Sequence, residues 1–290
     1  MPFVEYLVCG IWLAIWIVSA VYTFSIGEPE PRENYKFITE VKWDEKTRYI
    51  VFYQFFMLFW IDAFIVGVAQ FVIAASACIW YFEVNSDTGA TGCVGRGIKW
   101  AFRYHLGSIA FGAAIIAICE MIRAVFEYYR RKIKSMTSNK CVDCLVCCID
   151  KLLCCLEKCV KYITENAYIQ VALTNNNFCR SALNAFCLIL KNVARFGWLD
   201  SIGFVLNWFG VCSVAGVNGF CAYIVLTKVD DYKLNITQPI APTIVVVLIS
   251  FIIAKSFLSI ISYSMDAILQ SFLLDESIAE DGRTRPDHMQ

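Results

Sequence analysis

Five long runs of apolar residues constrain this chain more than any other feature. They cover residues 3–24, 52–82, 104–126, 202–226 and 244–274. A helix of about 20 apolar residues crosses the ~30 Å hydrocarbon core of a bilayer, and each of these runs is long enough to do so. The runs therefore predict an all-α fold: a polytopic membrane protein with five transmembrane helices in this chain.

The composition agrees with a membrane protein and excludes several functions. Hydrophobic residues make up 59% of the chain and charged residues 17%, whereas a soluble domain carries about a quarter charged residues. The formal net charge is zero, so we expect no nucleic-acid partner. The sequence holds two histidines and none of the GxSxG, HExxH or Walker motifs, so we expect no enzyme and no cofactor.

Basic residues in the connecting segments orient the predicted helices. Lys and Arg are frequent between the first and second runs and between the third and fourth, and sparse in the other two connections. The positive-inside rule then places the basic connections and the C-terminal tail in the cytoplasm, and Met1 outside. The first run is too long for a signal peptide and lacks a basic segment before it. Five crossings from an outside start lead us to expect that the protein has a preceding part.

This topology divides the chain into four parts. Residues 1–126 hold three transmembrane helices, 127–199 form a cytoplasmic Cys-rich amphipathic helical region, 200–274 hold two transmembrane helices, and 275–290 form a cytoplasmic tail. The stretch 178–198 is interrupted by basic residues, so we predict a second cytoplasmic helix there and not a sixth crossing. The sequon at Asn235 falls outside the membrane and makes this residue a candidate glycosylation site.

Seven cysteines follow one another closely within 141–159, in the order C-x2-C-x2-C-C-x5-C-C-x3-C. Most recur at helical spacing beside aliphatic residues, which predicts an amphipathic helix on the inner membrane surface. Cysteines at that level accept S-palmitoylation, with Cys147, Cys148, Cys154 and Cys155 as candidates. Pairs of the CxxC type also suit Zn²⁺ or an iron–sulfur cluster. A packing helix, an acylated helix and a metal site therefore remain three interpretations.

Ionisable groups inside a membrane-spanning helix are costly and indicate function or specific pairing. Asp62 and Gln70 lie in the second run, and Asp62 has no local partner of opposite charge. Glu120 and Arg123 are three residues apart, so a local ion pair is the simpler interpretation for them. Lys255 either extends toward the membrane surface or pairs with a carboxylate of another helix.

Aromatic residues form a stripe along one face of the second predicted helix and include Tyr53, Phe56 and Trp60. Ring faces attract cations, and aromatic cages bind quaternary ammonium groups. Stripes at this spacing also serve as packing or lipid-facing surfaces. Trp60 and Asp62 are about 200° apart on an ideal helix, so both can face one cavity only if the helix is kinked or unwound there.

Several segments carry motifs that occur together in one family of membrane proteins. The second run carries Trp60-Ile-Asp62-Ala-Phe64, which is similar to a family pattern of Trp, an acidic residue and Phe. The other matching segments are Arg103-Tyr-His-Leu-Gly107-Ser108, Cys155-Leu-Glu-Lys-Cys159, Glu165-Asn-Ala-Tyr168, residues 174–179, Ser181-Ala182, Ala185-Phe186, Phe257-Leu-Ser-Ile260, Asp266, Phe272 and Asp275. Together these motifs cover most of the chain and are specific, and on them the chain resembles the choline transporter-like protein family. The sequence departs from the family pattern at Glu120, Phe111, Lys255 and Ile261.

The resemblance implies a transporter of about ten helices with cytoplasmic termini, of which this chain is the C-terminal half. It also implies transport of choline or a related small organic cation, with a plasma-membrane or organelle-membrane location. The expected partners are choline or another small cation, membrane lipids, and either the N-terminal half or a second copy of the chain.

A permanently charged ammonium ion needs a cavity in which aromatic faces and a carboxylate replace water. The candidate binding residues are therefore Tyr53, Phe56, Trp60 and Asp62, with Tyr104, His105 and Trp208 from neighbouring helices. The alternative is a non-transporting membrane scaffold or regulatory half-protein, anchored by five helices and docking through its Cys-rich helix.

Overall fold

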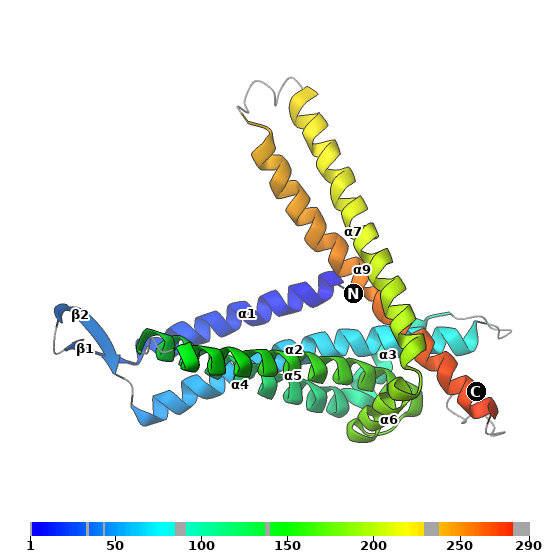
Figure 1. Ribbon diagram of the computed structural model, residues 1–290, viewed down its shortest axis with the longest axis horizontal. Coiled ribbons are helices and arrows are strands. Elements are labelled where there is room, and N and C mark those ends of the chain that lie inside the picture. Colours follow the sequence, from blue (N-terminus) through cyan, green and yellow to red (C-terminus); the bar gives the residue numbers. More distant parts are fainter. Residues whose placement is uncertain are drawn as a thin grey trace. The chain divides into compact units, whose positions relative to one another are not determined.

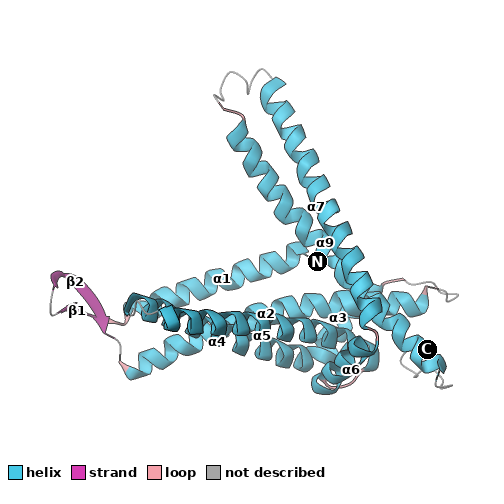
Figure 2. Cartoon of the chain, in the orientation of Figure 1, coloured by secondary structure: helices cyan, strands magenta, loops and turns pink. Residues whose placement is uncertain are grey.

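The computed structural model describes residues 2–32, 35–42, 44–84, 91–136, 140–228 and 238–280. The candidate glycosylation site Asn235 lies outside these ranges. Figure 2 shows that the described residues are almost entirely helical, apart from one short hairpin of strands. Five helices are long and apolar enough to cross a membrane, which confirms the predicted fold class. The chain divides into two compact units, which comprise residues 3–72 with 98–183, and residues 73–97 with those from 184 onward.

The helices of the first unit follow the predicted runs, with additions between them. The elements in chain order are α1 (Pro2–Ser25), β1 (Glu28–Arg32), β2 (Tyr35–Lys42), α2 (Glu45–Glu83), α3 (Cys93–Trp100), the π-helical turn η1 (Ala101–His105), α4 (Leu106–Met136) and α5 (Lys140–Thr174). The strands β1 and β2 pair antiparallel in a hairpin that the sequence analysis did not predict. The last part of α2 and all but the end of α3 belong to the second unit.

Helix α2 is α-helical without a break from Glu45 to Glu83. At 1.5 Å of rise per residue it is about 58 Å long, so it extends well beyond a ~30 Å hydrocarbon core. The unwound turn that would let Trp60 and Asp62 share one cavity is therefore not present in α2.

The core of the first unit lies where the second half of α5 packs against α2 and α4, and α4 and α5 lie side by side in Figure 1. Tyr168 of α5 is fully buried, and its hydroxyl donates a hydrogen bond to the carbonyl oxygen of Ile109 at 3.0 Å. Gly67 and Gly112 make room for its ring, because a Cβ atom at Gly112 would lie 2.6 Å from the Tyr168 hydroxyl oxygen and one at Gly67 3.0 Å from it. The pattern of the Cys-rich region did not indicate this buried contact.

The second unit is built on an antiparallel pair, α7 (Val193–Lys228) and α9 (Ile240–Glu280), preceded by α6 (Phe178–Lys191), whose first residues belong to the first unit. Close packing is possible where α7 has glycines: Gly210 lies against Leu258, and Gly219 lies against Val247. Near the end of α9, the buried Ser271 hydroxyl lies 3.6 Å from the Cys78 sulfur of α2.

Substitution of Gly112 by Ala should destabilise the first unit, because the added methyl group meets the Tyr168 hydroxyl and the Phe178 ring. Overpacking of this kind costs about 1–3 kcal/mol. Gly107→Ala, on the same helix, meets nothing within 4 Å and should leave stability equal or slightly higher. Thermal unfolding of the purified chain in detergent measures both, and equal melting temperatures for the two variants would contradict the role of Gly112.

Candidate functional site

Asp62, the predicted counter-charge, is exposed on the side of α2 that faces α1. A hydrogen bond joins its side chain to the Cys9 thiol of α1. Glu5, one turn earlier on α1, lies close enough to Asp62 for the two carboxylates to interact electrostatically. Two acidic groups of a membrane-spanning helix pair thus come together, an arrangement that favours a cation beside them.

A groove of about 330 Å³ opens next to this acidic pair. Glu5 is the charged residue of its lining, which is otherwise apolar and includes Val8 and Val68. Phe64 of α2 and Phe102 of η1 contribute aromatic rings. The volume is at the lower end of the range for small-molecule sites, and apolar walls with few polar groups are typical of such sites. Rings beside a carboxylate suit a small organic cation.

Phe56 and Trp60 do not line this groove, and Trp60 faces α4. Their ring centroids are 6.0 Å apart, and the Trp60 indole nitrogen donates a hydrogen bond to the Ala110 carbonyl oxygen at 3.1 Å. This bond fixes the indole against α4. The structure therefore brings Phe56 and Trp60 together, and it places Asp62 toward a different neighbouring helix. Tyr53, on the same stripe, is 61% exposed.

The turn η1 holds two further candidates, Tyr104 and His105. His105 is buried, with its ring centroid 5.1 Å from that of Phe71 on α2, whereas Tyr104 is 64% exposed. Turns of π-helix inside helices occur frequently at functional sites. Because η1 also supplies Phe102 to the groove, a change in this turn would alter one wall of the groove.

Trp208 belongs to α7 in the second unit, where it lines a pocket with Lys255. Its ring centroid lies 6.1 Å from those of Phe204 and Phe251. A neighbouring ammonium group repels a cationic ligand, so this surrounding is less suited to a small cation than the groove between α1 and α2.

Charged residues that the sequence analysis paired within α4 instead join α4 to α5. Arg123 pairs with Glu157, and Lys161 pairs with Glu120 at 2.7 Å and with Glu157 at 3.0 Å. The predicted local pair between Glu120 and Arg123 is therefore wrong, because each finds its opposite charge on α5. Spacing along one helix cannot show a partner that tertiary packing brings closer.

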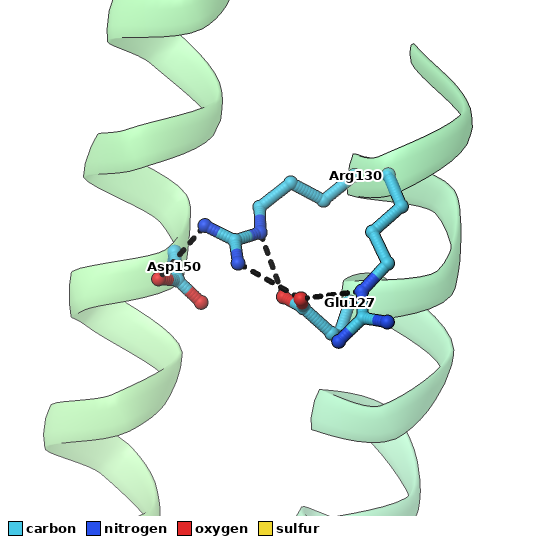
Figure 3. Close-up of polar contacts among 4 residues, drawn as sticks. Glu127, Arg130 and Asp150 are labelled. Atoms are coloured by element: carbon cyan, nitrogen blue, oxygen red, sulfur yellow. Dashed lines mark hydrogen bonds and ion pairs between the residues drawn. The ribbon is translucent and has the colours of Figure 1, made fainter. Parts of the chain in front are cut away.

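A second group of charges repeats this pattern one to two turns further along α4. Figure 3 shows the Arg130 guanidinium between the carboxylates of Glu127 and Asp150. Arg130 lies 2.7 Å from Glu127 on its own helix and 3.7 Å from Asp150 on α5, and Arg131 also pairs with Glu127. The two groups of ion pairs hold α5 antiparallel to α4.

Gln70 donates a hydrogen bond from its side-chain nitrogen to a Glu165 carboxylate oxygen at 3.0 Å and so links α2 to α5. The sequence analysis identified Gln70 as a polar residue of the second run but found no partner for it. Glu165 was missed as a partner because it falls in a region assigned to the membrane surface. The residues that follow it, Asn166 to Tyr168, are all buried. The absence of charged residues there was the feature of the sequence that could have indicated a buried segment.

The candidate acylation sites lie in the first half of α5. Cys147, Cys148 and Cys155 are exposed and Cys154 is partly buried, so modification at these positions stays a prediction. In the part of the chain that the structure describes, no three His, Cys, Asp or Glu side chains group as metal ligands would.

Glu157→Gln should loosen the α4–α5 pair, because this change removes the charge that faces both Arg123 and Lys161. We expect a loss of about 1 kcal/mol, at the upper end for partly exposed ion pairs, because the Glu157 side chain is only 13% exposed. Asp143→Asn, in the exposed first turn of α5, is the matched control. Thermal unfolding in detergent compares them, and an equal effect of the two changes would exclude the proposed role of Glu157.

Comparison with known proteins places the chain in a family. It matches the model of the plasma-membrane choline transporter family over residues 1–277. Choline transporter-like protein 2 of Xenopus laevis is 34% identical over 258 residues, which cover 83% of this chain and 35% of that protein.

Two further relatives match almost the whole chain. Choline transporter-like protein 2 of Dictyostelium discoideum is 30% identical over 291 residues, covering 99% of this chain and 45% of that protein. Choline transporter-like protein 1 of Mus musculus is 27% identical over 288 residues, covering 99% and 43%. The chain thus spans less than half the length of the relatives it matches. With five helices able to cross a membrane and a family match over residues 1–277, this chain is a multi-pass membrane protein that belongs to the plasma-membrane choline transporter family.

Proposed function

We propose that this chain provides helices of a carrier that moves choline or a related small organic cation across the plasma membrane. The observation that carries the proposal is the family match over residues 1–277. Because the chain spans less than half of its relatives, transport is proposed for a carrier to which these helices contribute. We propose no enzymatic step.

The groove between α1 and α2 is the proposed cation site. A quaternary ammonium ion keeps its charge at every pH, so its passage requires groups that replace water around it. Asp62 and Glu5 supply negative charge, and Phe64 and Phe102 supply ring faces in an apolar wall. These features occur together at this place, whereas the Trp60 face of α2 carries rings without a carboxylate. That Phe56 and Trp60 form an aromatic wall of a cation site on the α4 side of α2 stays a prediction.

Asp62→Asn should lower saturable uptake about tenfold, because it removes a charge beside the cation while keeping the size of the side chain. Radiolabelled choline uptake is measured in cells that express the chain alone or joined to any upstream reading frame, with surface abundance matched. Glu45→Gln, in the exposed first turn of α2, is the control for loss of a carboxylate and should leave uptake unchanged. Undiminished uptake by the Asp62→Asn variant would remove Asp62 from the site.

Trp60→Ala should weaken uptake at unchanged surface abundance, whereas Trp60→Phe should retain most uptake because it keeps a ring face. Trp60→Phe loses the hydrogen bond to Ala110. The surface abundance of this variant therefore shows how much the hydrogen bond contributes to folding. A parallel fall of uptake and surface abundance in both variants would assign Trp60 to packing alone.

Full surface abundance without uptake of choline or ethanolamine, by the chain alone and by the extended protein, would instead favour the scaffold alternative.

A further inference from the structure

The groove of the proposed cation site is lined almost entirely by hydrocarbon. Its lining on α1 consists of Val4, Glu5 and Val8. On α2 the lining begins at Phe64 and ends at Val72, which is about 12 Å of helix rise. Among the described residues that line the groove, Glu5 carries the one polar side chain. The remaining members of the lining are Ile65, Val68, Ala69, Ile98 and Phe102.

The direction of α1 against α2 shows which end of the groove carries the negative charge. The Trp16 indole of α1 donates a hydrogen bond to the Gln54 carbonyl oxygen of α2. Cys9 meets Asp62, so the residue numbers rise along α2 as they fall along α1, and the two helices run antiparallel. Glu5, one turn before Cys9, interacts electrostatically with Asp62. The two carboxylates therefore lie toward the same end of the groove, the end at which Phe64 lies.

The opposite end of the groove is apolar and lies at Val72. The rings of His105 and Phe71 are in contact, with their centroids 5.1 Å apart. Ile98 and Phe102 precede His105 in the chain and therefore line this end of the groove. A molecule that extends along the groove thus has a charged end and an apolar end to match.

Choline matches only the charged end. With its ammonium group beside the carboxylates, its hydroxyl group lies two carbon atoms away, toward the apolar part of the groove. A hydroxyl group that leaves water without gaining a hydrogen bond costs binding free energy. A methyl group in the same place strengthens binding, because it removes apolar surface from water.

We propose that this groove prefers quaternary ammonium ions with an apolar substituent, such as propyltrimethylammonium, over choline. The inference rests on the proposed cation site and names the class of ligand that the site binds best. The ammonium group lies beside Glu5 and Asp62 with the Phe64 ring against it, and the alkyl chain extends toward Val72. Each methylene group that enters the groove strengthens binding until the chain reaches the end of the apolar wall.

Equilibrium dialysis of the purified full chain in lipid nanodiscs tests this preference, with empty nanodiscs measured in parallel. Choline and propyltrimethylammonium are the decisive pair, because they differ only by a hydroxyl group in place of a methyl group. We expect the propyl ion to bind at least about fivefold more tightly than choline. From the propyl to the hexyl ion, affinity should rise about two- to fourfold per methylene group. Equal or weaker binding of the propyl ion would overturn the proposal.

Two variants separate the charged end from the apolar part of the groove. Glu5→Gln should weaken the binding of every alkyl ion by the same factor of about ten, because all of them share the ammonium group. Val68→Phe should fill the apolar part and reduce the gain with chain length. Ala14→Phe, at an exposed position of α1 outside the lining, is the matched control and should leave the gain unchanged.

A full gain with chain length in Val68→Phe would contradict the proposal, because the alkyl chain would then lie elsewhere. Thermal unfolding of each variant shows whether it is folded. If Val68→Phe does not fold, Phe102→Ala decides in the same way, because it removes part of the apolar wall at a ring that is 60% exposed.

Choline uptake by cells separates failure of this inference from failure of the proposed function. Uptake that depends on Asp62, without tighter binding of the propyl ion, overturns the preference and leaves the carrier. Tighter binding of the propyl ion without choline uptake supports the preference although transport fails. Binding of neither ion, by the chain alone or joined to any upstream reading frame, overturns the cation site and the preference with it.

Discussion

The buried contact between Tyr168 and the Ile109 carbonyl is the interaction on which the first unit depends. A phenol hydroxyl in an apolar interior requires a partner, and here it finds a backbone carbonyl oxygen of α4. The ring fits only because Gly67 and Gly112 lack side chains. This contact fixes α5 against α2 and α4, so the ion pairs further along α4 and α5 meet their partners.

The continuous helix α2 determines which neighbouring helix each of its aromatic and acidic side chains faces. Because the helix is not interrupted, residues two positions apart project to nearly opposite sides. The aromatic face therefore packs on α4, and the acidic residue faces α1. A carboxylate and aromatic rings come together where Phe64 and Phe102 border the groove beside Glu5. The site is thus assembled from α1, α2, α3 and η1 and not from one stripe.

The sequence predicted the features that depend on short-range patterns. Hydropathy located the five apolar helices, and helical geometry correctly separated Trp60 from Asp62 on α2. The predicted partner of Arg123 was wrong, because Glu157 is distant in sequence and only packing brings it near. The link between Gln70 and Glu165 was not predictable for the same reason. The hairpin of β1 and β2 follows the first apolar run without a pattern that marks it, since its strands contain two prolines and alternating charges.

The position of α5 has a consequence for how membrane topology is counted in chains of this kind. Glu157, Lys161 and Glu165 of α5 pair with side chains of α4 and α2, whereas Lys151 and Lys158 are exposed. A helix that carries so many polar residues gives no hydropathy peak, although it lies beside a helix apolar enough to cross a membrane. Helix α5 runs antiparallel to α4 from the Arg130 ion pairs to Ile109. It therefore returns the chain toward the end at which α4 begins. Whether loops share one side of a bilayer is decided by the parity of the helices that cross it. A polar helix that crossed beside such a partner would change this parity without being found from hydropathy.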